Sequence, residues 1–353
     1  MRHSPACLPA ISIAALLLSS YGLAAYGAEL PFQNLVVFGD SLSDTGNLYA
    51  ATGGIFPTPY PTPPFPADIN YTAGRLTDGT DTTPASTISG VWHEQLSGQL
   101  GLPISAPAAS GGTNYAFGGA ETGGNVDFSN TLGTVTAVGM AGQVGGFLSG
   151  KTSAPGNSLY VFWGGANDVF NASSGADART AAALALTNVT NEIGTLASEG
   201  GRYFLWVNLP PLDQTPRGKG SAFQSDLGAA SQAFNAALKN MSIPALEAQF
   251  PGISITGVDV YSLFEQVLMD PAAFGLTNVS DPAQGSSEVN PDQYLFWDTE
   301  HPTTAGHGLI ADLAAQDLDA ALAPEPASIF LLLGGLGLVM IVRRRKCQSI
   351  VHR

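Results

Sequence analysis

Short apolar runs, rich in β-branched and aromatic residues, recur along the middle of the chain and end abruptly at glycine or polar residues. Runs of about four to eight such residues predict strands that are buried on both faces. The sequence predicts strands of this kind at Leu35–Phe38, Leu159–Trp163, Tyr203–Val207 and Ile253–Val260.

Longer stretches rich in Ala and Leu lie between the later strands and after the last one, and they predict helices. The expected helices span Ala176–Ser198, Ala222–Phe250, Tyr261–Met269 and Thr304–Leu322. Strands that alternate with helices indicate an α/β fold, in which helices cover both faces of a central parallel sheet. We therefore expect three layers, α/β/α, with ligands bound at the carboxyl ends of the strands.

Residues 49–90 do not follow this alternation. Residues 53–66 contain six prolines, interleaved with aromatic residues such as Phe56 and Tyr60. Proline lacks the backbone N–H that a helix interior or a central strand requires, so neither is expected here. Two interpretations stay open: a surface loop, or a semi-rigid aromatic wall beside a site.

The chain begins with a segment typical of a secretory signal peptide. A weakly basic start is followed by a short apolar core, Ile11–Leu18, and then by small residues through Ala28. The core is too short to span a bilayer, which takes about 20 residues. We expect residues 1–28 to be a signal peptide that is cut between Ala25 and Ala28; a buried helix is the alternative.

The C-terminus combines three parts. A Pro-Glu-Pro motif at 324–326 precedes the apolar run Ala327–Val342, and the basic cluster Arg343–Lys346 follows it. As a helix the run would be about 24 Å long, which is marginal for a hydrocarbon core of ~30 Å. Because basic residues stay on the cytoplasmic side, we expect a transmembrane segment at 327–342 and a short cytoplasmic tail at 347–353.

The order of these parts resembles the PEP-CTERM sorting signal of Gram-negative bacteria, over residues 324–346. That resemblance implies an exosortase-type processing enzyme as a partner. It also implies delivery of the chain to the cell envelope, the cell surface or an extracellular matrix, with the C-terminal segment as an anchor at least for a time. A plain tail anchor that stays uncut is the alternative.

Setting both ends aside leaves a strongly acidic body. The chain has 13 basic and 28 acidic residues and a formal net charge of −15. Six of the basic residues and one acidic residue lie in the two ends, so residues 29–323 carry a net charge of −20. Phosphate binding needs clustered Lys and Arg, so we expect no nucleic acid partner. Cys7 and Cys347 also lie in the ends, which leaves the body without a disulfide or a thiol nucleophile.

Candidate chemistry lies where the first two predicted strands end. Ser41 follows the first strand, before a turn, where its hydroxyl is exposed and the next helix can present N–H groups to developing negative charge. A Gly-x-Ser-x-Gly motif is absent, because Ser43 stands in place of the second glycine. Asn167, just past the second strand, can aim its amide at an oxyanion or cap the next helix.

The body contains three histidines, and a serine esterase needs one as its base. His301 is the candidate, since Asp298 three residues earlier can orient it by a hydrogen bond across a turn. We expect His93 to lie exposed on a helix and His307 to have a structural role. A metal site at Asp298, His301 and His307 has no HExxH or Cys/His pattern to support it, so neither a metal nor another cofactor is expected.

The chain contains four sequence blocks: FGDSLSDTGN at 38–47, NYAFGGA at 114–120, GGAND at 164–168 and DTEH at 298–301. In this order, the blocks resemble those of the GDSL family of lipases and esterases, also called SGNH hydrolases. The resemblance implies a hydrolase domain over residues 29–323, with a central parallel sheet in a flavodoxin-like arrangement. Residues 208–212 resemble the family's bacterial phospholipase-like and plant-type subgroup.

The family's catalytic roles carry over onto the matching positions of this chain. The resemblance implies that Ser41 is the nucleophile and that His301 is the general base and later the general acid. It implies that Asp298 orients His301 and stabilises the imidazolium. The expected reaction requires no metal and no organic cofactor.

The resemblance also implies an oxyanion hole made of the backbone N–H groups of Ser41 and Gly119 and the side-chain amide of Asn167. Paired glycines let the backbone approach a ligand closely. Gly118 would replace Gly119 if the register differed by one residue.

These expectations describe an exported serine esterase or lipase. Its substrate would be a carboxylic ester of a lipid or of an acylated polysaccharide. A polysaccharide O-deacetylase of the same mechanism is one alternative. A surface or matrix protein with a vestigial site is another, although the full set of motif residues speaks against it.

Overall fold

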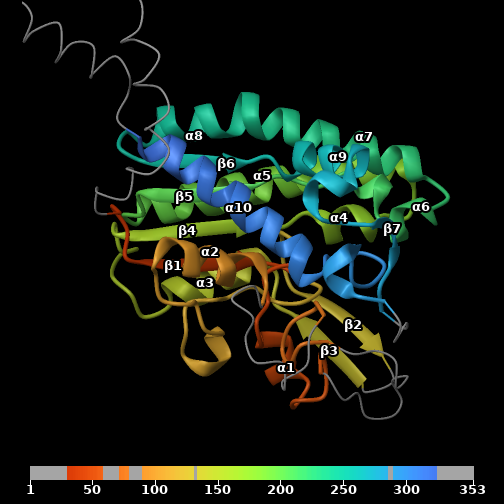
Figure 1. The fold of residues 1–353 in the computed structure, drawn as a ribbon. Coiled ribbons are helices and arrows are strands. Elements are labelled where there is room, and N and C mark those ends of the chain that lie inside the picture. Colours follow the sequence, from red (N-terminus) through yellow and green to blue (C-terminus); the bar gives the residue numbers. More distant parts are fainter. Residues whose placement is uncertain (1–29, 59–70, 79–89, 131–132, 285–288, 324–353) are drawn as a thin grey trace, which may run out of the picture. The chain divides into compact units, whose positions relative to one another are not determined.

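The computed structural model describes residues 30–58, 71–78, 90–130, 133–284 and 289–323 (Figure 1). The chain divides into a body, Pro31–Leu318, and a second unit formed by the two chain ends. The signal peptide expected at 1–28, the sorting signal expected at 324–346 and the tail at 347–353 lie outside the described residues and stay predictions. No helix within the described ranges is long and apolar enough to cross a membrane; the segment expected at 327–342 is not among them.

In the part of the chain that the structure describes, four parallel strands form the central sheet, in the order β1-β4-β5-β6. All the predicted strands are confirmed. The last one ends earlier than expected because Asp259 caps the next helix, its side chain accepting the Ser262 N–H. The strands are β1 (Asn34–Gly39), β4 (Ser158–Trp163), β5 (Tyr203–Val207) and β6 (Ser254–Val258).

The predicted helices are confirmed, one of them with a break. The long helix expected over Ala222–Phe250 contains a π turn at Leu238–Ser242. Pro244 lies in the first turn of the segment that follows, and its missing N–H interrupts the hydrogen-bond ladder. The helices are α1 (Asn47–Ala51), α2 (Trp92–Leu100), α3 (Met140–Leu148), α4 (Ala166–Phe170), α5 (Gly175–Ser198), α6 (Pro216–Lys219), α7 (Gln224–Ala237), α8 (Ile243–Gln249), α9 (Val260–Met269) and α10 (Thr304–Leu322).

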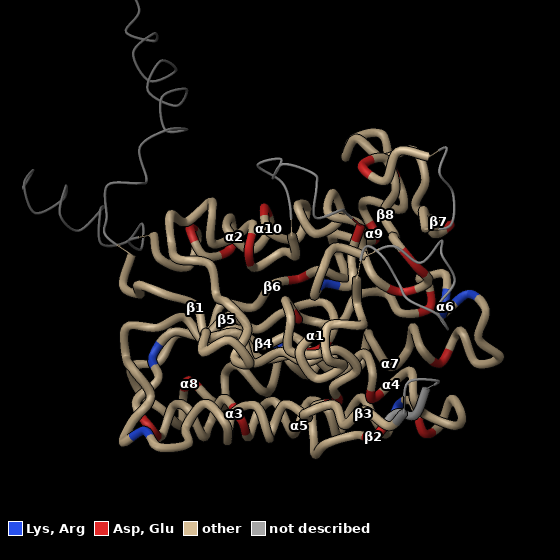
Figure 2. The backbone as a smooth tube through the Cα atoms, turned by 90° about the horizontal axis from the view of Figure 1, so that it is seen from below, with Lys and Arg blue, Asp and Glu red and all other residues tan. Residues whose placement is uncertain are grey.

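Helices cover both faces of the sheet, so the predicted three-layer α/β/α fold is confirmed. Figure 2 shows α3, α5 and α8 on one side of the strands and α2, α9 and α10 on the other. On the first side Tyr160, Phe162 and Trp206 belong to a core shared with α3, α5 and α7. On the second side Trp92 of α2 meets Trp163 of β4 edge to face, with ring centroids 5.5 Å apart. Stacking of this kind adds to the burial that holds the layers together.

Among the residues that the structure describes, two small sheets lie outside the central one, and neither was expected from the sequence. β2 (Val126–Asn130) pairs antiparallel with β3 (Gly133–Ala137), and β7 (Asn278–Pro282) pairs parallel with β8 (Tyr294–Phe296). No continuous apolar run marks β2, β3 or β7. β8 leads directly into the turn Asp298–His301, and the His301 carbonyl accepts the N–H of the residue that follows β8.

Candidate active site

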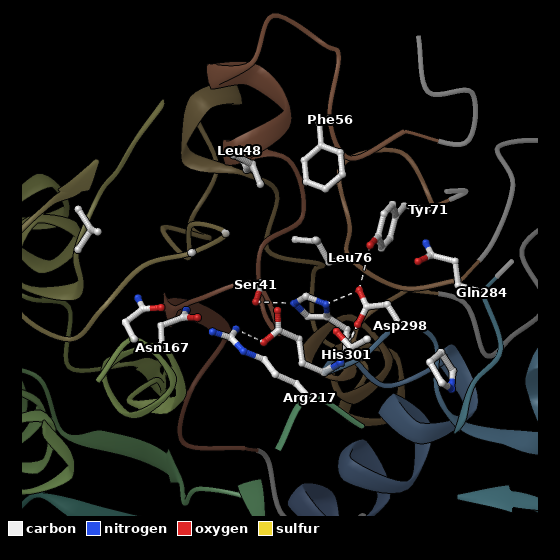
Figure 3. Close-up of a pocket in the computed structure, with 17 residues that line it drawn as sticks. Ser41, Leu48, Phe56, Tyr71, Leu76, Asn167, Arg217, Gln284, Asp298 and His301 are labelled. Atoms are coloured by element: carbon white, nitrogen blue, oxygen red, sulfur yellow. Dashed lines mark hydrogen bonds and ion pairs between the residues drawn. The ribbon is translucent and has the colours of Figure 1, made fainter. Parts of the chain in front are cut away.

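Ser41, His301 and Asp298 form a continuous row of hydrogen bonds (Figure 3). His301 Nε2 lies 2.8 Å from Ser41 Oγ, and His301 Nδ1 lies 2.6 Å from Asp298 Oδ2. Ser41 is the second residue after the end of β1, whereas the other two residues lie in the turn between β8 and α10. The fold thus brings together residues 260 positions apart, at the carboxyl end of the sheet.

The turn around Asp298 fixes the direction of its carboxylate. Oδ1 accepts the backbone N–H groups of Glu300 and His301, at 2.8 and 2.7 Å, and Oδ2 also accepts the Tyr71 hydroxyl at 2.9 Å. Burial alone would raise the pKa of Asp298, but the facing His301 and the two backbone hydrogen bonds lower it. An ionised Asp298 can only accept, so His301 Nδ1 carries a proton and Nε2 is left to accept from Ser41.

The charge of Asp298 also acts on the imidazole. Burial alone would lower the pKa of His301, yet the Asp298 carboxylate, and after it Glu300 and Asp40, raise it above its ordinary value of 6.5. The protonated ring is therefore stabilised relative to a histidine in water. This is the electrostatic arrangement that a base needs if it is to take a proton from a hydroxyl.

Two aspartates shape the loop that carries Ser41. Asp40 Oδ1 accepts the Leu42 N–H at 3.0 Å, and burial raises the pKa of Asp40 to about 7. Asp44 accepts N–H groups from residues 46–48, at 2.7 to 2.9 Å, and so begins α1. It also accepts the Gly118 N–H at 2.8 Å, which connects the nucleophile loop to the glycine pair.

The three groups expected to form an oxyanion hole all line the cavity in front of Ser41. Within the described ranges, the backbone N–H groups of Ser41 and Gly119 have no hydrogen-bond partner. The Gly118 N–H is occupied by Asp44, so the structure favours Gly119 over Gly118 as a donor. Gly119 has a φ of 80°, which only glycine adopts readily. The Asn167 amide lies next to this loop and donates one N–H to the Ala120 carbonyl at 2.9 Å.

The position of Asn167 depends on its neighbour. Asp168, also in the first turn of α4, accepts the Thr122 N–H at 3.0 Å and the Thr122 hydroxyl at 2.7 Å. These bonds connect α4 to the segment that follows Gly118 and Gly119. Asn167, which lines the cavity, is therefore positioned by its own bond to Ala120 and by the bonds of Asp168 to Thr122.

Ser41 lies in the wall of a cavity of about 560 Å³. Part of its lining is apolar, and part is polar, including an ion pair between Arg217 and Glu300 at 2.6 Å. The described parts of the segment 49–90 line this cavity, which favours the aromatic wall over a plain surface loop. The apolar lining is formed by Leu48, Phe56, Leu76 and Val126, and the polar lining includes Tyr71, Gln284, Arg217 and Glu300.

The other two histidines of the body lie away from the cavity. The expectation that His93 is exposed is wrong: α2 packs against the loop after β1, and His93 Nε2 lies 2.9 Å from the Ser43 carbonyl oxygen. His307 is fully buried near the start of α10, where burial lowers its pKa to about 3. Among the described residues, no group of three or more His, Cys, Asp or Glu side chains is placed to hold a metal ion.

Several residues of the cavity were not identified from the sequence, and Tyr71 and Arg217 are the two that bond to the turn Asp298–His301. Tyr71 donates to Asp298 across 227 positions, and Arg217 belongs to the short helix α6. The guanidinium of Arg217 lies 4.4 Å from the centre of the Phe170 ring, and its backbone N–H donates to the Thr299 carbonyl. Neither lies in one of the motif blocks, so only the three-dimensional fold brings them to the site.

The row of hydrogen bonds at the end of a parallel sheet is the arrangement of a serine hydrolase. The model of the GDSL-like lipase/acylhydrolase family matches residues 35–314 of the chain. The chain therefore belongs to this family of ester hydrolases, as the motif blocks indicated.

Three relatives illustrate the range of the similarity. A thermolabile hemolysin of Vibrio parahaemolyticus is 27% identical over 79% of this chain and 62% of its own length. A phosphatidylcholine-sterol acyltransferase of Aeromonas hydrophila is 25% identical over 82% of this chain and 91% of its own length. The esterase EstA of Pseudomonas aeruginosa is 28% identical over 89% of this chain, which spans only 52% of that protein.

Proposed function

We propose that this chain is an exported serine esterase or lipase that hydrolyses carboxylic esters through an acyl-enzyme on Ser41. The observation that carries the proposal is the unbroken row from Asp298 Oδ2 through His301 to Ser41 Oγ, with steps of 2.6 and 2.8 Å. These are distances at which a proton can pass from the hydroxyl to the ring.

The reaction follows from the geometry in two steps. As Ser41 Oγ attacks the ester carbonyl, His301 Nε2 takes the hydroxyl proton, and Asp298 stabilises the resulting imidazolium. The N–H groups of Ser41 and Gly119 and the Asn167 amide would bind the oxyanion of the tetrahedral intermediate. His301 then gives its proton to the leaving alcohol, and a water molecule, activated by the same ring, hydrolyses the acyl-enzyme and regenerates Ser41.

The cavity supports short- or medium-chain acyl esters as substrates. Leu48, Phe56 and Leu76 offer an apolar surface beside the nucleophile, as an acyl chain requires. The name of the Aeromonas relative, a phosphatidylcholine-sterol acyltransferase, also favours an acyl ester of a lipid. The resemblance of residues 208–212 to the phospholipase-like subgroup agrees with this choice.

A polysaccharide O-deacetylase is the second candidate. The polar part of the cavity, with Gln284, Arg217 and Glu300, could bind sugar hydroxyls beside a small acetyl group. The resemblance of residues 324–346 to a sorting signal would place the enzyme near an extracellular matrix. The same proposal includes this placement, processing by an exosortase-type enzyme and anchoring by segment 327–342. Fractionation of cells that express the chain with and without residues 324–353 tests these parts.

The test is hydrolysis of p-nitrophenyl esters, from acetyl to dodecanoyl, by the full chain and by Ser41→Ala. We expect activity that disappears in Ser41→Ala, with a maximum at short or medium acyl chains. A maximum at acetyl together with release of acetate from an acetylated polysaccharide would favour the deacetylase. Ser110→Ala, which removes an exposed hydroxyl outside the cavity, is the matched control. Equal activity in Ser41→Ala would refute the proposal.

A further inference from the structure

The segment 71–78 is bonded to the turn that carries the candidate base at three points. The Tyr71 hydroxyl donates to Asp298 Oδ2 at 2.9 Å, and the Thr77 hydroxyl donates to the Pro302 carbonyl at 2.9 Å. Asp78 accepts the Thr304 N–H at 2.5 Å and the Thr304 hydroxyl at 3.1 Å. The segment therefore spans the turn from Asp298 to the first residue of α10.

The segment is also anchored on its other side. Arg75 forms a two-point ion pair with Glu94 of α2, Nε at 2.7 Å and Nη2 at 2.5 Å. Within the loop, the Tyr71 N–H donates to the Thr58 carbonyl, and the Tyr71 ring meets Phe56 edge to face at 5.5 Å between centroids. Tyr71 is 6% exposed. Its burial and these contacts hold its hydroxyl at Asp298.

The Tyr71 hydroxyl shares an acceptor atom with the candidate base. Asp298 Oδ2 receives both the His301 Nδ1 hydrogen bond and the Tyr71 hydrogen bond, whereas Oδ1 receives only backbone N–H groups. Burial, and then the nearby Asp298 charge, raise the pKa of Tyr71 above its ordinary value of 10.0. The phenol therefore keeps its proton throughout the working range and always acts as a donor.

We propose that Tyr71 is a positioning residue that, through Asp298, holds His301 in line with Ser41 and limits the basicity of the imidazole. The inference rests on the proposed function, since it concerns the same proton transfer. A donor on Oδ2 withdraws charge from the atom that faces His301, and it keeps the carboxylate from turning away from the ring. The segment 71–78 would then be part of the catalytic apparatus and not only a wall of the cavity.

The groups around His301 allow this effect to be isolated. Asp298, Glu300 and Asp40 act on the ring by their charges, and Arg217 forms an ion pair with Glu300. His307, whose own pKa His301 helps to lower, is a further titratable group that interacts with His301. Tyr71→Phe removes one donor oxygen and changes none of these groups, so a shift in the titration of His301 reports on the Tyr71–Asp298 bond.

The experiment is the pH dependence of kcat/KM for p-nitrophenyl butyrate hydrolysis, with the full chain, Tyr71→Phe and Ser41→Ala. We expect Tyr71→Phe to lower kcat roughly tenfold with KM unchanged, since hydrogen bonds to charged groups are the strong ones. We also expect the acid limb to move up by roughly 0.5 pH unit or more, because Asp298 without the donor stabilises the imidazolium further. If Tyr71→Phe only raises KM, or keeps its acid limb at the wild-type pH, the inference is overturned and Tyr71 only lines the cavity.

Tyr160→Phe is the matched control for the loss of a buried phenol. Its hydroxyl donates to the Pro155 carbonyl, away from the site, so the variant should keep the wild-type acid limb whatever happens to its stability. If Tyr71→Phe fails to fold, 3-fluorotyrosine at position 71 retains the shape and strengthens the donor, and the acid limb should then move down. Activity that persists in Ser41→Ala refutes the proposed function itself, whereas an inactive Ser41→Ala beside an unshifted Tyr71→Phe refutes only this inference.

Discussion

Two regions of the molecule each bury a carboxyl group. Asp298, in the turn between β8 and α10, is 8% exposed, and Glu192, in the C-terminal half of α5, is 6% exposed. Asp298 accepts two backbone N–H groups, a phenol and a histidine ring. Both carboxyl oxygens of Glu192 lack a hydrogen-bond partner among the described residues. Burial, and then the charge of Asp168, raise the pKa of Glu192 to about 9, whereas the pKa of Asp298 lies below its ordinary value of 3.8.

Burial is therefore the same in the two places, and the donors make the difference. Without donors, the free energy of placing a charge inside the protein protonates the acid. Asp298 has donors on both oxygens and a histidine opposite, so its carboxylate stays ionised. The ionised group is the one that the proposed chemistry needs, and the neutral one lies on α5 and does not line the cavity.

Replacing each of the two carboxyl groups by its amide should break the comparison most visibly. Asp298→Asn keeps the shape but turns His301 toward the wrong tautomer, and we expect kcat to fall about 10⁴-fold. Glu192→Gln replaces a neutral group by a neutral one, and its kcat should equal that of the wild type. Ester hydrolysis by the two purified variants measures this, and an equal loss in both would mean that the two carboxyls do not differ in function.

A substitution in α4, the helix that contacts α5, offers the next largest effect. Asn167 of α4 faces the cavity, and Asp168 beside it acts on Glu192. Asn167→Ala should lose about 10²–10³ in kcat, the range for one oxyanion donor, with little change in melting temperature. Asn157→Ala, at an exposed asparagine before β4, is the control. Activity of Asn167→Ala within threefold of the wild type, on the order of 1 kcal/mol or less, would remove Asn167 from the oxyanion hole.

The carboxyl group of Glu192, which lacks hydrogen-bond donors, should affect the free energy of unfolding. Glu192 has an ordinary pKa of 4.5 in the unfolded chain and one of about 9 in the fold, so folding takes up a proton between these values. Its contribution to stability is present below pH 4.5 and is lost as pH rises toward 9. Glu192→Gln should therefore be more stable than the wild type by about 3 kcal/mol at pH 7 and nearly equal at pH 4.5. Denaturant unfolding at several pH values measures the difference, and a pH-independent one would contradict the assignment.

The smallest effect is on the pH profile of the wild type. His301 must be neutral to take the Ser41 proton, and its pKa is raised, so kcat/KM should fall on the acid side with a midpoint above 6.5. Glu192→Gln should share that midpoint. A midpoint below 6.5 would mean that Asp298 does not act on His301 as its carboxylate geometry indicates.

The fold was predictable where burial requires a continuous apolar run in the sequence. The four central strands are covered on both faces, so their sequences are apolar runs, such as Leu159–Trp163. The strands β2, β3 and β7 carry no such run. The break after α7 could have been expected from Pro244, whereas the buried state of His93 could not, because it depends on how α2 packs against a distant loop.

The site was predictable where the motif blocks carry it. Ser41, Gly119, Asn167, Asp298 and His301 all lie in those blocks, and the fold brings them to one cavity. The choice between Gly118 and Gly119 needed the hydrogen bond from Gly118 to Asp44, and the bond of Tyr71 to Asp298 joins residues 227 positions apart. Sequence spacing carries no information on such contacts.

The central claim is that Ser41 is the nucleophile and that the Asp298–His301 pair activates it. A fluorophosphonate probe, followed by peptide mapping of the labelled full chain, tests this most directly. The account predicts a single label on Ser41 that is absent in Ser41→Ala and forms far more slowly in Asp298→Asn than in Glu192→Gln. A label at another residue, or ester hydrolysis by a protein whose Ser41 stays unlabelled, would contradict it.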